Sequence, residues 1–246
     1  MEFERARRIA GQWRQVDATG STNADLVAAA GADPELPHLT VLLTRDQRAG
    51  RGRRDRVWQA PAGSSLAVSV LVRVPDVPPA ARGWIPLAAG AAMATAVRAQ
   101  LPGHDTGLKW PNDVLVDGRK ICGILAEGTA GLETVVIGSG INTAMSPDDL
   151  PVPTATSFAA LGATCDEDAL IATYLTELDR LLASLREGRE AVRDAVTALC
   201  LTLGREVTVS LPDGSALRGA ATDIDLDGRL VVAGTAVSAG DVVHVR

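Results

Sequence analysis

The pattern of the sequence changes at Gly204, and this change limits the folds open to the two parts of the chain. From Gly204 onward, short valine-rich runs alternate with Pro-Asp-Gly, Asp-Gly and Ala-Gly turn signals. Short strands separated by such turns are typical of a small β-barrel, for which about forty residues are enough. At 246 residues the chain is long enough for one main domain and a small one. We therefore predict a main domain over residues 1–203 and a small SH3-like β domain over residues 204–246.

The main domain mixes strand and helix patterns, which places it in the α/β class. Aliphatic side chains recur at every second position over residues 66–74, and further apolar strands are expected at 39–44 and 133–142. Asp117 and Gly118 stand between two β-rich runs and predict a two-residue hairpin turn, because both central residues of such a turn need a positive φ. Helices are expected within residues 1–16, after Ser21-Thr22-Asn23, through the alanine-rich run that begins near Pro86, and over about 166–186 and 189–203.

The charge and composition of the chain argue against several classes of protein. The formal net charge is −6, whereas a dedicated nucleic-acid binder needs a broad basic face, so no DNA partner is expected. We find no signal-peptide pattern and no apolar run of about 18 residues that suggests a membrane span. Cys122, Cys165 and Cys200 lack CxxC or zinc-site spacing, which favours buried free thiols in a reducing compartment. A cytoplasmic protein without a membrane partner is therefore expected.

The stretch QRAGRGRRDRVW, from Gln47 to Trp58, gathers five arginines in an acidic chain. Such a stretch is either a solvated charge run or a loop that binds a small anion, and the paired glycines and the tryptophan favour the loop. It is not a phosphate-binding Walker loop, and Asp55 stands where a GxGxxG motif needs glycine. We expect this arginine loop to be disordered when empty, because its like charges repel, and to fold over an anionic ligand that neutralises them.

A second polar stretch, LKWPNDVLVDGRKICGILAE, runs from Leu108 to Glu127. Asn112 and Asp113 follow a proline and mark either an ordinary turn or part of a site. Lys120 lies just past the predicted hairpin turn, so it is either on a solvated sheet face or in a pocket. In a pocket its ammonium would suit a carboxylate ligand.

Four stretches together resemble the biotin–protein ligases, also called biotin–[acetyl-CoA-carboxylase] ligases. They are STN at 21–23, the arginine loop at 47–58, KWPNDVLVDGRKICGILAE at 109–127 and GSGIN at 138–142. The resemblance implies an α/β catalytic domain of the class II synthetase type, with a mixed sheet backed by helices, followed by the small β domain. It also implies an enzyme that activates biotin with ATP to biotinyl-5′-AMP. That enzyme then transfers the biotin to one lysine of the biotin carboxyl carrier domain of a carboxylase.

The resemblance also carries roles to particular residues. Biotin-binding positions are implied for Ser21, Thr22, Asn23, Gln47, Arg51, Gly52, Arg53, Lys120, Gly123 and Gly140. Contacts with ATP or the adenylate are implied for Arg51, Arg53, Arg56, Trp58, Lys109, Asn112 and Asn142. Lys120, Arg53 and Asp113 are the implied catalytic residues, with Asp113 a candidate acceptor for the proton of the attacking lysine. Asp55 and Arg48 depart from the usual glycine and glutamine of the family's loop.

Mg²⁺ is expected to arrive with ATP, and the sequence assigns no metal ligands to the protein. Three other readings stay open at this stage: a lipoate–protein ligase or octanoyltransferase, a DNA-binding regulator of the same family, and a non-catalytic biotin-binding protein. Only about twenty residues precede Ser21, which favours a monofunctional enzyme over the regulator, because a DNA-binding domain needs several helices. The sequence leaves open whether the chain is a monomer or a weak homodimer.

Overall fold

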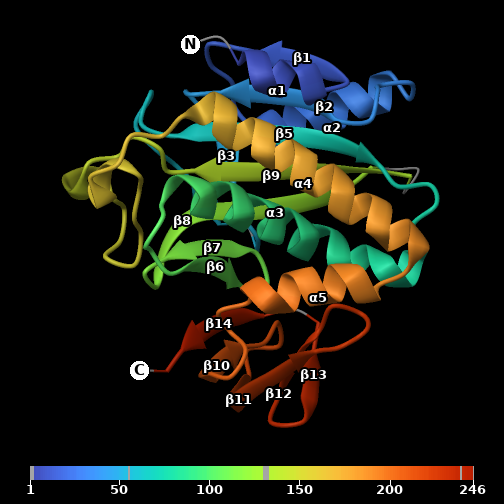
Figure 1. The fold of residues 1–246 in the computed structure, drawn as a ribbon, viewed down its shortest axis with the longest axis vertical. Coiled ribbons are helices and arrows are strands. Elements are labelled where there is room, and N and C mark those ends of the chain that lie inside the picture. The colour runs from blue at the N-terminus through green and yellow to red at the C-terminus, as the bar shows by residue number, and fades with distance from the viewer. Residues whose placement is uncertain (1–2, 55, 130–132, 239, 246) are drawn as a thin grey trace.

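The computed structural model describes residues 3–54, 56–129, 133–238 and 240–245. A seven-stranded sheet in the order β1-β2-β5-β9-β8-β7-β6 forms the middle of the larger part (Figure 1). Its strands are β1 (Gln12–Gln15), β2 (Thr40–Thr44), β5 (Leu66–Arg73), β9 (Thr134–Ile141), β8 (Arg119–Gly128), β7 (Asp113–Val116) and β6 (Thr106–Lys109). The β1–β2 pair is parallel and every other neighbouring pair is antiparallel, so the expected mixed sheet is confirmed.

Helices cover both faces of this sheet. They are α1 (Glu4–Ile9), α2 (Thr22–Ala32), α3 (Ile85–Gln100), α4 (Glu167–Glu187) and α5 (Glu190–Leu199), with short 3-10 turns at Pro79–Trp84, Pro147–Asp149 and Ala159–Leu161. Helices α3 and α4 cross one face, and their apolar side chains join the main core (Figure 1). Helix α2 packs on the opposite face, where a smaller apolar cluster forms around Leu26, Leu42, Leu71 and Val136. Successive strand residues point to opposite faces, which separates the two clusters.

Several local predictions are confirmed. Asp117 and Gly118 have φ angles of 49° and 75°, as a tight hairpin turn requires. Ser21 caps α2 through its side-chain oxygen. The structure adds a cap that was not predicted, since the side chain of Asp166 accepts from the backbone N–H of Ala169 at the start of α4. The alanine-rich helix α3 is buried along most of its length, because its small side chains let it lie close to the sheet and to α4.

The first sixteen residues differ from the prediction of a single short helix. Helix α1 ends at Ile9, and β1 then pairs in parallel with β2. The first turn of α1 is held by a distant residue, since the Asp168 carboxylate accepts hydrogen bonds from the backbone N–H groups of Arg5 at 3.1 Å and Ala6 at 2.9 Å. The two partners of this segment, β2 and Asp168, lie far from it in the sequence. The residue pattern of the segment alone therefore does not predict these contacts.

The second of the two C-terminal helices also ends earlier than predicted. Helix α5 stops at Leu199 instead of 203. The next residues turn to pair with β6, where the backbone N–H of Leu201 donates to the carbonyl of Leu108 at 2.8 Å. A backbone partner on the sheet therefore ends the helix before its sequence pattern does.

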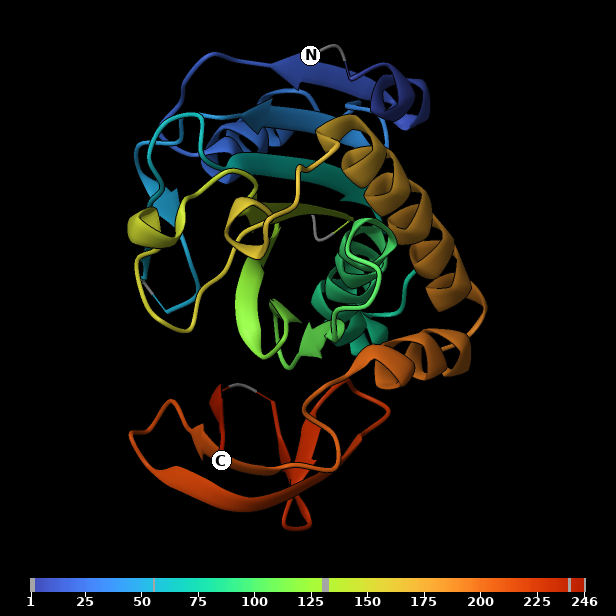
Figure 2. The same cartoon turned by 60° about the vertical axis from the view of Figure 1, so that its left-hand side comes forward.

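The C-terminal segment forms a small antiparallel sheet in the order β13-β12-β11-β10-β14. Its strands are β10 (Glu206–Ser210), β11 (Ala216–Ile224), β12 (Leu230–Val232), β13 (Thr235–Val237) and β14 (Asp241–His244). This C-terminal sheet lies beyond α5 and below β6 and β7 (Figures 1 and 2). Two buried tryptophans of the larger part dock it: Trp84 Nε1 donates to the carbonyl of Leu226 at 2.8 Å, and Trp110 Nε1 donates to that of Gly228 at 3.1 Å. The boundary at residue 203 stays a prediction, because the apolar cores of the two parts are continuous.

No helix in the described ranges has both the length and the apolar character needed to cross a membrane.

His244 on β14 is a group through which we expect the stability of the protein to depend on pH. Its Nε2 lies 3.2 Å from Thr202 Oγ1, which accepts a hydrogen bond from the backbone N–H of Trp110 at 3.1 Å. Burial, with smaller contributions from the nearby Lys109 and Arg205, lowers the pKa of His244 from 6.5 to about 4. Between these two values the unfolded chain binds more protons than the folded one, so stability falls as the pH drops.

We predict that replacing His244 with glutamine flattens the dependence of stability on pH between 6.5 and 4. The wild type should lose about 1–2 kcal/mol more over this interval than the variant, a value reduced for the partial exposure of the ring. Urea unfolding at a series of pH values measures both curves. Parallel curves for the two proteins would show that His244 does not titrate as described.

Candidate active site

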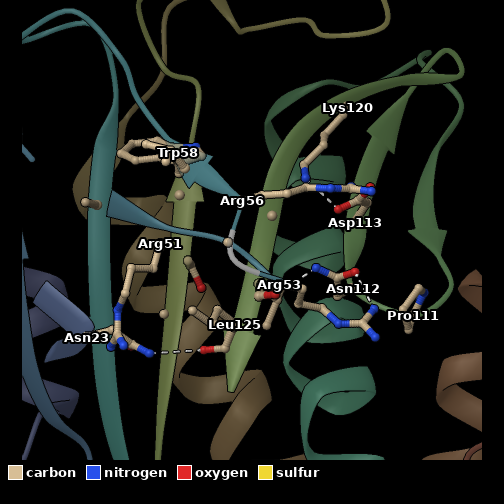
Figure 3. A pocket seen from close by; sticks show the side chains of 18 of the residues that line it. Asn23, Arg51, Arg53, Arg56, Trp58, Pro111, Asn112, Asp113, Lys120 and Leu125 are labelled. Carbon is tan, nitrogen blue, oxygen red and sulfur yellow. Dashed lines mark hydrogen bonds and ion pairs between the residues drawn. The ribbon is translucent and has the colours of Figure 1, made fainter. Parts of the chain in front are cut away.

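A cavity of about 320 Å³ opens on the face of the main sheet that also carries α2 (Figure 3). Strands β5, β8 and β9 form its floor, the N-terminus of α2 and the arginine loop form one side, and β7 and β14 form the other. All the predicted site residues except Asn142 line it: Ser21, Thr22, Asn23, Gln47, Arg51, Gly52, Arg53, Arg56, Trp58, Lys109, Asn112, Asp113, Lys120, Gly123 and Gly140. Segments far apart in sequence thus meet at one cavity, while the ligand that each residue contacts stays a prediction.

Glycines in the floor let large side chains lie close to the sheet. A Cβ atom at Gly140 would stand 2.6 Å from the ring of Trp58, and one at Gly138 would stand 2.7 Å from Asn23 Oδ1. Both distances are shorter than van der Waals contact. Any side chain at these two positions of β9 would therefore displace Trp58 or Asn23 from the cavity.

The end of the cavity at α2 is a network of mostly uncharged hydrogen-bonding groups, in which the carboxylate of Glu127 accepts from the side chain of Asn23 and is paired with Arg51. The side-chain oxygen of Gln47 accepts from the backbone N–H of Thr22 at 2.8 Å and from its hydroxyl at 3.1 Å. The hydroxyl of Ser69 lies 2.8 Å from the Thr22 hydroxyl and 3.0 Å from Asn23 Oδ1. Ser21 completes this end of the cavity. Such a set of donors and acceptors suits a neutral polar ring.

The opposite end of the cavity carries two lysines around one carboxylate. Lys120 Nζ lies 2.6 Å from Asp113 Oδ1, and Lys109 Nζ lies 3.9 Å from Asp113 Oδ2 (Figure 3). Lys120 therefore points into the cavity, which decides between the two orientations that the sequence left open. Burial lowers the pKa of Lys109, partly offset by Asp113. A cluster with more cationic than anionic groups favours an anionic ligand at this end.

A backbone irregularity holds Lys120 in place. The register between β7 and β8 shifts between Val114, which faces Cys122, and Leu115, which faces Lys120, so that Ile121 is the extra residue of a bulge next to Lys120. The backbone N–H of Lys120 donates to the carbonyl of Thr154 at 2.8 Å, and its carbonyl accepts from the N–H of Thr156 at 2.8 Å. This bulge aims the side chain at Asp113, as bulges near active sites commonly do.

The arginine loop is folded, with β3 (Gly50–Arg51) pairing with β4 (Val57–Trp58). Arg51 Nη2 lies 2.9 Å from Glu127 Oε2, and Arg53 Nη1 donates to Asn112 Oδ1 at 3.1 Å. Protein acids at Asp46, Glu127 and Asp241 pair with Arg48, Arg51, Arg54 and Arg56. The prediction that the empty loop is disordered considered the repulsion among its arginines and left these carboxylates out. That a ligand orders the loop stays a prediction. Asp55, the departure from the family pattern, lies outside the described residues.

Asn142 is not among the residues that line the cavity. It follows β9 and is buried, and its side-chain amide donates to the carbonyl of Thr156 at 2.9 Å. Asn142 is therefore positioned to hold the segment that also clamps Lys120. Its predicted contact with the nucleotide stays a prediction.

Sequence reasoning missed several residues of the site. Ser69 and Leu125 lie inside strands that were identified, but nothing in the strand pattern distinguishes a cavity-lining position. Glu127 ends the quoted stretch at 108–127, yet its pairing with Arg51 and Asn23 depends on the fold. Asp241, Val242 and Val243 come from the C-terminal sheet, and no local signal connects them with a cavity in the larger part.

Comparisons with known proteins agree with this architecture. The model of the biotin/lipoate A/B protein ligase family matches residues 20–142, and that of the biotin protein ligase C terminal domain matches residues 202–245. A biotin–[acetyl-CoA-carboxylase] ligase of Mycobacterium tuberculosis is 44% identical over 244 residues, which cover 95% of this chain and 90% of that protein. The bifunctional ligase/repressor BirA of Escherichia coli is 40% identical over 128 residues, which cover 51% of this chain and 38% of that protein.

A solved structure shares the fold over nearly the whole chain. It is the biotin protein ligase from Aquifex aeolicus in complex with biotin and ATP, with a TM-score of 0.79 at 21% identity. The match covers 96% of this chain and 99% of that one, so it includes the C-terminal sheet as well as the main sheet.

Proposed function

Because this chain belongs to the biotin/lipoate A/B protein ligase family, we propose that it is a biotin–[acetyl-CoA-carboxylase] ligase and that the cavity is its active site. The enzyme activates biotin with ATP to biotinyl-5′-AMP and then transfers the biotin to a lysine of a carboxyl carrier domain. The observation that carries this proposal is the polarity of the cavity, which joins an end of mostly uncharged hydrogen-bonding groups to an end where two lysines surround one carboxylate. Biotin has the matching polarity, with a ureido ring at one end and a carboxylate at the other.

In the first step an oxygen of the biotin carboxylate attacks the α-phosphorus of ATP, and pyrophosphate leaves. Both reactants are anions, so their repulsion must be offset before they meet. Arg51, Arg53 and Lys120 supply fixed positive charge at the place where the two ligands join, which lowers the barrier most where charge builds up in the transition state. Positioning supplies much of the remainder.

The mechanism needs no nucleophile from the protein. Cys122 is the cysteine adjacent to this site, but it is fully buried, and burial raises the pKa of its thiol to about 12. A thiol in that environment does not ionise near neutral pH and is not available for attack. The biotinyl group therefore does not pass through Cys122, and we propose its direct transfer from the adenylate.

In the second step the amine of the carrier lysine attacks the acyl carbon, and AMP leaves with the electrons of the broken acyl–phosphate bond. The amine must lose a proton, and Asp113 is the carboxylate in the cavity beside Lys120. The ion pair with Lys120 keeps Asp113 close to the carbonyl that reacts. Edge-strand pairing with the β-rich carrier would present its lysine at the cavity mouth.

Mg²⁺ enters this scheme as part of the substrate Mg-ATP. Among the described residues, no group of three or more His, Cys, Asp or Glu side chains is arranged to hold a metal ion. Asp113 and Asp241 line the cavity but are paired with Lys120 and with the arginines of the loop, so Mg²⁺ would be held mainly by the phosphates of ATP. The donor set therefore fits a metal that accompanies the nucleotide and screens the phosphate charge.

A cytoplasmic location is supported by the three free cysteines.

Release of pyrophosphate tests the proposal directly. Purified protein should release pyrophosphate when biotin and Mg-ATP are both present, and should then label a carrier domain on one lysine, as detected by mass spectrometry. Lipoate in place of biotin should give little release. A protein that binds biotin in calorimetry without releasing pyrophosphate would be a binding protein, and release with lipoate alone would assign it to the lipoate branch.

A further inference from the structure

Asp241 is the first residue of β14, an edge strand of the C-terminal sheet, and it lines the active-site cavity. Its Oδ2 atom accepts a hydrogen bond from Arg54 Nη1 at 3.1 Å and another from Arg56 Nη2. Arg54 also approaches the carbonyl of Ser210 on β10 at 3.4 Å. The tip of the arginine loop is thus bound to a part of the chain about 185 residues away.

These polar contacts hold a loop that has little apolar burial of its own. Strands β3 and β4 contain two residues each, and the Val57 side chain between the arginines and Trp58 is 69% exposed. Glu127 on β8 pairs with Arg51 near the base of the loop, while Asp241 pairs with the arginines toward its tip. A loop fixed chiefly by charge opens more easily than one packed into a core, because partly exposed ion pairs are weak and screened by salt.

We infer that Asp241 is a positioning residue that latches the arginine loop over the acyl-adenylate from the side of the C-terminal sheet. The inference rests on the proposed ligase function. The latch keeps Arg53 and Arg56 above the cavity, so its loss lets the adenylate leave between its formation and its transfer. The carboxylate acts through the loop and needs no contact with biotin.

Dissociation of biotinyl-5′-AMP from the full-length protein measures the latch. We expect Asp241→Asn to release the adenylate about 10-fold faster, equivalent to about 1.4 kcal/mol, while the dissociation constant for biotin changes less than 2-fold. Asp241→Glu should restore most of the retention. Glu206→Gln is the matched control, because it removes an exposed charge from the same sheet away from the loop and should leave dissociation unchanged. An Asp241→Asn rate equal to that of wild type overturns the inference.

Two further readouts separate a latch from general damage. Raising KCl from 50 to 500 mM should accelerate dissociation in wild type more than in Asp241→Asn, since the variant has already lost the screened contact. Arg54→Gln should reproduce part of the faster dissociation, because Arg56 still pairs with Asp241, and the double variant should be no faster than Asp241→Asn alone. Additive effects would overturn the assignment.

Limited trypsin digestion without substrates tests the latch independently of the ligase activity. Cleavage after Arg51 and Arg53 should be several-fold faster in Asp241→Asn than in wild type or Glu206→Gln, at matched thermal stability. If wild type releases no pyrophosphate but the protection difference is present, the proposed function fails and the latch stands. Equal cleavage of all three proteins overturns the latch, whatever the activity.

Discussion

Replacing Lys120 with alanine is expected to lower kcat/KM for biotin-dependent pyrophosphate release by about 10²–10³-fold, the usual loss when one preorganised charge donor is removed. The ammonium lies 2.6 Å from Asp113 and points into the cavity. Without it, we expect the biotin carboxylate to meet the Asp113 carboxylate with one cation fewer to offset their repulsion, since Lys109 lies farther from Asp113 than Lys120 does. The loss should appear both in the binding of biotin and in kcat, because the charge acts on the ground state and on the transition state.

Arg119→Ala is the matched control for this variant. Arg119 precedes Lys120 on β8 and is exposed. Its loss removes an equal charge from the same strand and should change kcat/KM by less than about 2-fold, as expected for a screened surface charge. Pyrophosphate release by a coupled assay measures both variants. If Lys120→Ala retained more than a tenth of wild-type kcat/KM, Lys120 would not be the residue that meets the carboxylate.

The features that sequence predicted well are those set by neighbouring residues. The turn at Asp117 and Gly118 follows from backbone sterics, and the start of α2 follows from the Ser21 cap. The cavity residues in the quoted stretches were also identified, because their family resemblance is local in sequence. Each of these signals lies within a few residues of the structure it predicts.

The features that sequence missed depend on partners far along the chain. Strand β1 was taken as part of a helix, although its partner β2 lies about 28 residues away. The carboxylates of Glu127 and Asp241 offset part of the positive charge of the arginine loop, yet they stand 76 and about 185 residues from the arginines they meet. The charge balance of a site is a property of the folded chain. An argument from the loop alone therefore overstated its self-repulsion.

Replacing Arg53 with glycine is expected to release biotinyl-5′-AMP about 100-fold faster, equivalent to about 2.7 kcal/mol. The Arg53 guanidinium is part of the cavity lining and donates to Asn112 Oδ1 at 3.1 Å, and Asn112 in turn donates to the carbonyl of Ile124 at 2.9 Å. Burial lowers the pKa of Arg53, but a guanidinium stays protonated at neutral pH. The variant therefore loses a fixed positive charge against the adenylate phosphate, and the glycine also loosens the loop.

The two contributions of Arg53 can be separated by substitution. Arg53→Gln keeps the backbone stiff and removes only the charge, so it should show most of the faster release, about 30-fold or more. Arg48→Gly is the control for backbone freedom, because Arg48 lies in the same loop, is exposed and pairs only with Asp46 among the described residues. It should change release by less than about 3-fold. Stopped-flow dissociation and the accumulation of free AMP from hydrolysed adenylate report the same event. If Arg48→Gly leaked as fast as Arg53→Gly, loop flexibility would govern retention, and the charge of Arg53 would not.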